Sequence, residues 1–134
     1  MPTRTTTKHG NLMLLRAAAT VQTVAVFVQA ITAGLLLSAP GHGAPHSAGA
    51  YTLFVVTVLH LIVAIVTWRP GGGAPGPILY AAGFLGLTLA QVALGIAHVK
   101  TVHIPLGVLM FGLSALQLVW IWSGRRTGVR TVRA

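Results

Sequence analysis

Four long apolar segments constrain the fold of this chain more than any other feature of its sequence. They run from about Ala17 to Ala39, Ser47 to Trp68, Ile78 to Ala97 and Ile104 to Trp122. A helix that rises about 1.5 Å per residue crosses a bilayer in about 20 residues, so each segment is long enough to span one. Only 7% of the residues are charged, whereas an average soluble domain has roughly 25%. A water-soluble fold would therefore expose large apolar patches, and the sequence predicts a membrane protein.

Short stretches that cannot continue a helix separate the four segments. Pro and Gly fill the breaks at residues 40–45 and 69–77, and both residue types interrupt helices. The third break, residues 98–103, is shorter, and Pro105 after it suits the first turn of a helix. Short loops make successive spans antiparallel. We therefore expect an all-α, polytopic membrane protein: an antiparallel four-transmembrane-helix bundle over residues 17–122, between basic tails at residues 1–16 and 123–134.

The basic residues are unevenly distributed around these spans, and the chain has no Asp or Glu. With both termini cytoplasmic, the outer side holds only Lys100, and the inner side holds Arg4, Lys8, Arg16, Arg69, Arg125, Arg126, Arg130 and Arg133. The positive-inside rule thus predicts cytoplasmic N- and C-termini in a multi-pass protein of a cell membrane, such as a bacterial inner membrane. Because the charges flank the spans and do not cover a folded polar face, we expect contact with the lipid bilayer and no nucleic-acid partner.

The residue types that the chain lacks exclude most enzyme chemistry. Without side-chain carboxylates there is no glycosidase acid pair, no triad Asp and no ligand set for Mg²⁺ or Ca²⁺. Without Cys there are no disulfides, thiolate zinc sites, iron–sulfur clusters or covalently attached haem. The composition therefore favours a non-enzymatic role and leaves histidine as the main side chain for cofactor chemistry.

The chain reads as two similar helix pairs, an internal repeat. Residues 28–34 in the first segment resemble residues 90–95 in the third, and each stretch is followed by an outer loop and a histidine, His46 or His103. Fourteen residues further on lie His60 and Gln117. Fourteen residues make nearly four helical turns, so each pair shares a helix face with about 21 Å between its members.

Polar side chains within the spans form two layers. Gln29 and Gln91 lie in the outer half, and Gln22, His60 and Gln117 lie in the inner half. Such groups are costly in a membrane and usually have a partner or a role. The amides suit hydrogen bonds between helices. His60 is either a neutral histidine bonded to Gln22 or Gln117, or a ligand or proton-handling group.

Small residues recur at helical spacing in the third segment, at Ala82, Gly86 and Ala90. This pattern lets membrane helices approach closely, and we expect it on a contact face of the bundle. Gly83 and Gly95 lie nearby in the same segment, and Gly34, Gly107 and Gly112 lie in other segments. The alternative is that these glycines leave room for a flat cofactor.

Four of the six histidines, His42, His46, His98 and His103, cluster at the outer ends of the predicted helices. Neutral imidazole is a ligand for copper, zinc and haem iron. Three interpretations follow: His46 and His103 clamp one haem from facing helices, several of the four bind a metal ion, or all are polar interface residues.

The stretch from Gln91 to Gly107, with its Gln91-Val-Ala-Leu-Gly95 run and His103-Ile-Pro105, resembles the corner between the third and fourth helices in one half of the haem A synthase family. That family has two related four-helix halves with haem-ligating histidines at the ends of the even-numbered helices. The resemblance covers about residues 28–122 and implies that His46 and His103 are such ligands. This chain has one half only and no acidic residue near the haem, so the resemblance implies a single-bundle relative that binds haem b or has lost it.

Two hypotheses on function follow. In the first, the protein binds a b-type haem between helices two and four near the outer face, through His46 and His103, with Lys100 placed to meet a propionate. In the second, it is a cofactor-free accessory or assembly subunit that packs against a larger membrane complex, or against further copies of itself.

Overall fold

The computed structural model describes residues 4–39, 41, 43–69 and 75–123. It confirms an all-α bundle of four helices: α1 (Arg4–Ser38), α2 (Gly43–Trp68), α3 (Gly76–Ile96) and α4 (Lys100–Ser123). Each helix is long and apolar enough to cross a membrane, which makes this a multi-pass membrane protein in contact with lipid. His42 and the basic residues after Ser123 lie outside the described residues.

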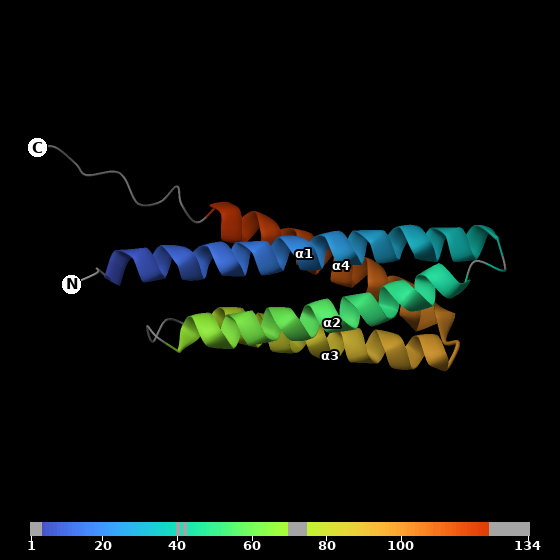
Figure 1. Ribbon diagram of the computed structural model, residues 1–134. Helices are drawn as coiled ribbons and strands as arrows, with labels where there is room; N and C mark the ends of the chain where they lie inside the picture. Colours follow the sequence, from blue (N-terminus) through green and yellow to red (C-terminus); the bar gives the residue numbers. More distant parts are fainter. Residues whose placement is uncertain (1–3, 40, 42, 70–74, 124–134) are drawn as a thin grey trace, which may run out of the picture.

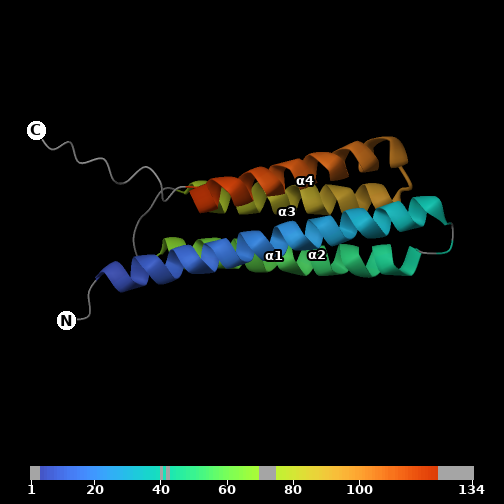
Figure 2. The ribbon, with the colours of Figure 1, turned by 90° about the horizontal axis from the view of Figure 1, so that it is seen from above.

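The helices run alternately up and down the bundle (Figures 1 and 2). α1 packs against α2 and α4, and α3 packs against the same two helices, so α2 and α4 are diagonal to each other. The start of α1 and the end of α4 lie at the end of the bundle where α2 ends and α3 begins (Figure 1). We call this the inner end, after the predicted orientation, and the opposite end the outer end. The first residues of α2 and α4 therefore share one depth, at the outer end.

Three helix starts differ from the sequence prediction. α2 begins at Gly43, so its first turn includes Pro45 of the expected break, a position where helices tolerate proline. α1 begins at Arg4, because no proline interrupts the chain between Arg4 and Ser38, so its helix continues through the segment expected to be a tail. α4 begins at Lys100, which places Pro105 inside the helix and not in its first turn. The missing N–H of Pro105 leaves the Thr101 carbonyl without its usual helical donor.

A left-handed residue, His98, ends α3 and turns the chain into α4. Its φ angle is 57°, and its N–H bonds the Gly95 carbonyl while the Val99 N–H bonds the Leu94 carbonyl. This is the hydrogen-bond pattern of a Schellman motif, in which glycine usually holds the left-handed position. His98 is exposed, and its role is to hold the left-handed position that ends α3.

The interior alternates between polar and apolar layers. A central apolar cluster of Val26, Leu53, Phe84 and Met110 brings together one residue from each helix. On α2 and α4 the inward residues repeat every seven positions, as His46, Leu53 and His60 on the one helix and His103, Met110 and Gln117 on the other. Large apolar side chains on the sides of the bundle, such as Trp120 at 80% exposure, face away from the other helices, as lipid contact requires.

The small-residue pattern of α3 does not lie on a contact face of the bundle, and that expectation was wrong. Ala82, Gly86 and Ala90 are all exposed, and a β-carbon built on Gly86 meets no atom within 4 Å. The inward face of α3 carries Ala81, Phe84 and Thr88, because the polar and aromatic side chains turn toward the other helices. Close approaches occur instead at Gly49, Gly95 and Gly107.

Candidate functional site

The outer polar layer brings the His46 and His103 rings close together across the bundle. Each is the fourth residue of its helix, and both are half-buried. Their ring centroids lie 6.1 Å apart, and the ring planes are nearly perpendicular at 77°. The diagonal placement of α2 and α4 and the equal depth of their first turns cause this meeting, as the sequence predicted from loop lengths.

The hydrogen bonds to Nδ1 determine the form of each ring. In His103, Nδ1 donates to the Gln91 carbonyl at 3.0 Å, since a carbonyl oxygen only accepts. In His46, Nδ1 lies 3.3 Å from the Thr32 hydroxyl, whose own proton goes to the Gln29 carbonyl at 2.9 Å, so Nδ1 donates here too. With Nδ1 as the donor, the neutral form of each ring carries its lone pair on Nε2, and this is the tautomer that ligates metals through Nε2.

A glutamine supports each histidine from the neighbouring odd-numbered helix. Gln29 donates from Nε2 to the His46 carbonyl at 3.0 Å, and its Oε1 occupies the space where a β-carbon on Gly49 would lie. A β-carbon on Gly107 would lie 2.8 Å from Nε2 of Gln91. Each half of the chain thus seats a glutamine against a glycine that follows the histidine by about one turn.

Two other predicted outer residues, Lys100 and His98, do not join this pair. Lys100 is exposed at the start of α4, one helical turn before His103, and His98 is exposed in the turn described above. Among residues 4–39, 41, 43–69 and 75–123, no group of three or more His, Cys, Asp or Glu side chains could hold a metal ion. The described outer layer therefore offers two imidazoles and no third protein ligand.

No family model, curated protein or solved structure matches this chain. The site must therefore be judged from its own geometry.

The inner polar layer centres on His60, which is 1% exposed. Its Nδ1 donates to Oε1 of Gln22 at 2.7 Å, which is one of the two pairings that the sequence predicted for His60. Gln117, the other predicted partner, lies in the same half with its Oε1 buried and without a partner in the described part of the chain. All five predicted intramembrane polar residues thus face the interior, with Gln29 and Gln91 in the outer layer and Gln22, His60 and Gln117 in the inner layer.

Sequence reasoning did not predict the contacts of three contributing residues. Thr32 holds the His46 ring, Tyr80 lies beside His60 with ring centroids 6.3 Å apart, and Arg16 is 2% exposed. Arg16 donates from Nε and Nη2 to the Ile121 carbonyl, at 3.2 and 3.1 Å, and lies 4.7 Å from the centroid of a Trp122 ring. Its charge thus meets the negative end of the α4 dipole. The only sequence feature that pointed to this contact is the position of Arg16 directly before the first apolar segment.

Proposed function

We propose that this protein binds a b-type haem between α2 and α4 near the outer end, with His46 and His103 as axial ligands. The observation that carries the proposal is the pair of opposed imidazoles whose Nδ1 atoms already have acceptors. Ligating histidines typically donate their other ring N–H to a carbonyl or hydroxyl group, which fixes the ring and leaves Nε2 for the metal.

The separation of the rings fits one metal ion between them. An imidazole nitrogen that ligates a metal lies about 2 Å from it, so two imidazoles on opposite sides have centroids roughly 6 Å apart. The centroids of His46 and His103 are 6.1 Å apart.

Haem suits this donor set better than a bare ion does. Zinc sites use three or four protein ligands, whereas a haem brings four nitrogens of its own and needs two from the protein. The resemblance of Gln91 to Gly107 to haem A synthase supports the same assignment. Lys100, one turn from His103 at the outer end, is placed to meet a propionate. When bound, such a haem supplies one-electron exchange at iron.

A visible-region spectrum of the purified full-length protein from haem-replete cells tests this proposal. We expect a sharp Soret band and resolved α and β bands after reduction, and loss of the low-spin spectrum in His46→Ala and in His103→Ala. The matched controls His42→Ala, His60→Ala and His98→Gly retain it, since none of these residues is a proposed ligand. A colourless wild type, or a spectrum indifferent to both ligand substitutions, would overturn the proposal.

The second candidate function is that of an accessory subunit of a larger membrane complex. The observation that favours it is the outward-facing ladder of Ala82, Gly86 and Ala90 on α3, since small residues at this spacing let another membrane helix approach closely. A colourless wild type whose association with other membrane proteins is weakened by Gly86→Leu would support this role in place of haem binding.

A further inference from the structure

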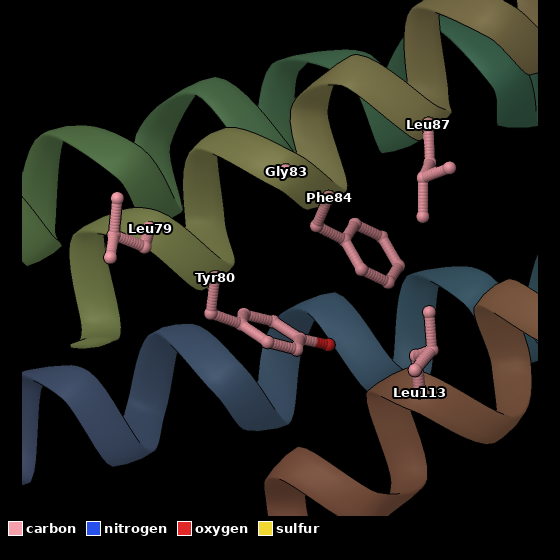
Figure 3. A pocket seen from close by; sticks show the side chains of 6 residues that line it. All are labelled: Leu79, Tyr80, Gly83, Phe84, Leu87 and Leu113. Carbon is pink, nitrogen blue, oxygen red and sulfur yellow. The ribbon is translucent and has the colours of Figure 1, made fainter.

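The inner polar layer takes one residue from each helix: Gln22, His60, Tyr80 and Gln117. Nδ1 of His60 donates to Oε1 of Gln22 at 2.7 Å, and the centroids of the His60 and Tyr80 rings lie 6.3 Å apart. The Tyr80 ring borders an apolar groove between α3 and α4 (Figure 3), but its hydroxyl is buried. His60 of α2 thus lies beside layer residues of both α1 and α3.

Two contacts between α1 and α4 fix the depth of Gln117. The hydroxyls of Thr23 and Ser114 lie 2.8 Å apart, and Arg16 donates to the Ile121 carbonyl. Gln117 lies between these two contacts on α4, and the layer's glutamine on α1 lies between them too. The fourth residue of the layer therefore shares the depth of the others to within about one helical turn.

Each residue of the layer carries one buried polar atom that has no partner in the described part of the chain. These atoms are Nε2 of Gln22, Nε2 of His60, the Tyr80 hydroxyl and Oε1 of Gln117. Gln22 is 0% and His60 is 1% exposed. Among the described side chains the one other such atom is Oε1 of Gln91, in the outer layer. Buried polar atoms usually bond to protein or to ordered water, so their concentration in one layer indicates a bound molecule.

The four atoms define the chemistry of that molecule. The Gln22 amide nitrogen donates, Oε1 of Gln117 accepts, and the Tyr80 hydroxyl does either. Nε2 of the neutral His60 ring accepts, because the one N–H of that ring already bonds Gln22. None of the four side chains is a carboxylate or a permanent cation. The layer thus suits a small neutral molecule that both donates and accepts hydrogen bonds.

Small side chains flank the layer. Ala19, Ala64 and Ala81 lie within about one turn of the layer residues of α1, α2 and α3, and they are 0%, 1% and 1% exposed. Their methyl groups take little volume and offer no hydrogen bond. A water molecule takes up only about 30 Å³ and makes about three hydrogen bonds when buried. Water therefore meets the requirements of size and bonding.

We propose that the inner polar layer binds an internal water molecule that its side chains share. The water donates to Nε2 of His60 and to Oε1 of Gln117, and it accepts from the Tyr80 hydroxyl or the Gln22 amide. It thereby brings Oε1 of Gln117 into one hydrogen-bond network with the other three helices. The site does not depend on haem, because about four helical turns separate it from the histidine pair along α2 and α4.

Magnetisation transfer from water, measured by NMR on the labelled full-length protein in detergent micelles, tests the proposal directly. The ring proton on Cδ2 of His60 borders Nε2 and lies across the ring from the exchangeable Nδ1 proton, so it reports water bound at Nε2. We expect a cross-peak between water and this proton. The methyl groups of Val26 and Leu53, in the central apolar cluster, are the control and should show none. Absence of the cross-peak to His60 would overturn the proposal.

Tyr80→Phe tests the same site through the sign of its effect on stability. The substitution loses the hydrogen bond to water, and we expect the equilibrium constant for unfolding in detergent to rise about threefold to tenfold. A hydroxyl with no partner gives the opposite result, because its removal relieves a desolvation cost and the constant falls. Tyr51→Phe, at a tyrosine that is 75% exposed, is the matched control and should stay within about twofold of wild type. A Tyr80→Phe variant more stable than wild type would contradict the bound water.

A double variant tests whether the water is shared. Gln117→Met keeps most of the side-chain volume and removes the amide, and we expect its unfolding constant to rise by a similar factor. Because both substitutions remove bonds to one water, the rise in the double variant Tyr80→Phe/Gln117→Met should be smaller than the product of the two single rises. Independent effects would contradict a shared water. Coupling without transfer from water to His60 would indicate a direct bond between Tyr80 and Gln117, and it would also overturn the proposal.

Discussion

At the scale of single residues, the candidate site depends on the acceptors of two protons, the Nδ1 protons of His46 and His103. Gln91 presents a backbone carbonyl and Thr32 a hydroxyl, and each accepts the Nδ1 proton of one histidine. The histidines themselves were predictable, because loop lengths alone place the starts of α2 and α4 at one depth. The bond between Thr32 and His46 was not predictable, because apolar residues surround a membrane helix on all sides and the rotation of the helix cannot be read from the sequence pattern.

Thr32→Val tests this arrangement, because valine keeps the shape of threonine and removes the acceptor for His46. We expect haem to bind about tenfold more weakly, in line with the usual 10–100-fold cost of losing such a partner, while the absorption spectrum stays low-spin because both axial ligands remain. The measurement is a haem titration of the apoprotein. Thr52→Val is the control, since that exposed hydroxyl bonds only the Ala48 carbonyl of its own helix. Equal affinities in all three proteins would contradict the role assigned to Thr32.

At the scale of helices, the number and order of the spans followed directly from hydropathy and from Pro and Gly in the breaks. The rotation of α3 did not, and its small residues proved to face outward. The reason is that lipid and protein interior are both apolar, so apolar periodicity does not separate them. The polar residues indicate helix rotation better than the apolar ones do. Gln91 on α3 and Gln29 on α1 both face the interior, and each lies against a glycine of the next helix.

Gly49→Ala tests that helix contact. The added methyl group takes the space of Gln29 Oε1, so the glutamine side chain must swing away and lose its bond to the His46 carbonyl. We expect the free energy of unfolding in detergent to fall by about 1 kcal/mol, the usual net value of one hydrogen bond. In a Gln29→Ala background the same substitution should cost almost nothing, because there is no side chain to displace. Gly112→Ala, which meets no atom, is the control, and an equal cost in both backgrounds would argue against the contact.

At the scale of the whole molecule, the two ends of the bundle differ in charge and in chemistry. The described basic side chains Arg16 and Arg69 lie at the inner end and Lys100 at the outer end. The His46–His103 pair lies toward the outer end, and the buried His60–Gln22 pair lies toward the inner end. Which side of the membrane each layer faces depends on the orientation of the bundle.

Cysteine labelling tests that orientation, and the chain has no native Cys to interfere. Gly43 begins α2 at the outer end, and Gly76 begins α3 at the inner end. A β-carbon on Gly43 comes no closer than 3.9 Å to Leu36, and one on Gly76 meets nothing, so both positions accept the change. The excess of Lys and Arg on the side of the termini predicts that this side stays cytoplasmic. An impermeant maleimide added to intact cells should therefore label Gly43→Cys and spare Gly76→Cys, and permeabilised cells should label both. The reverse pattern in intact cells would invert the molecule and place the histidine pair on the cytoplasmic side.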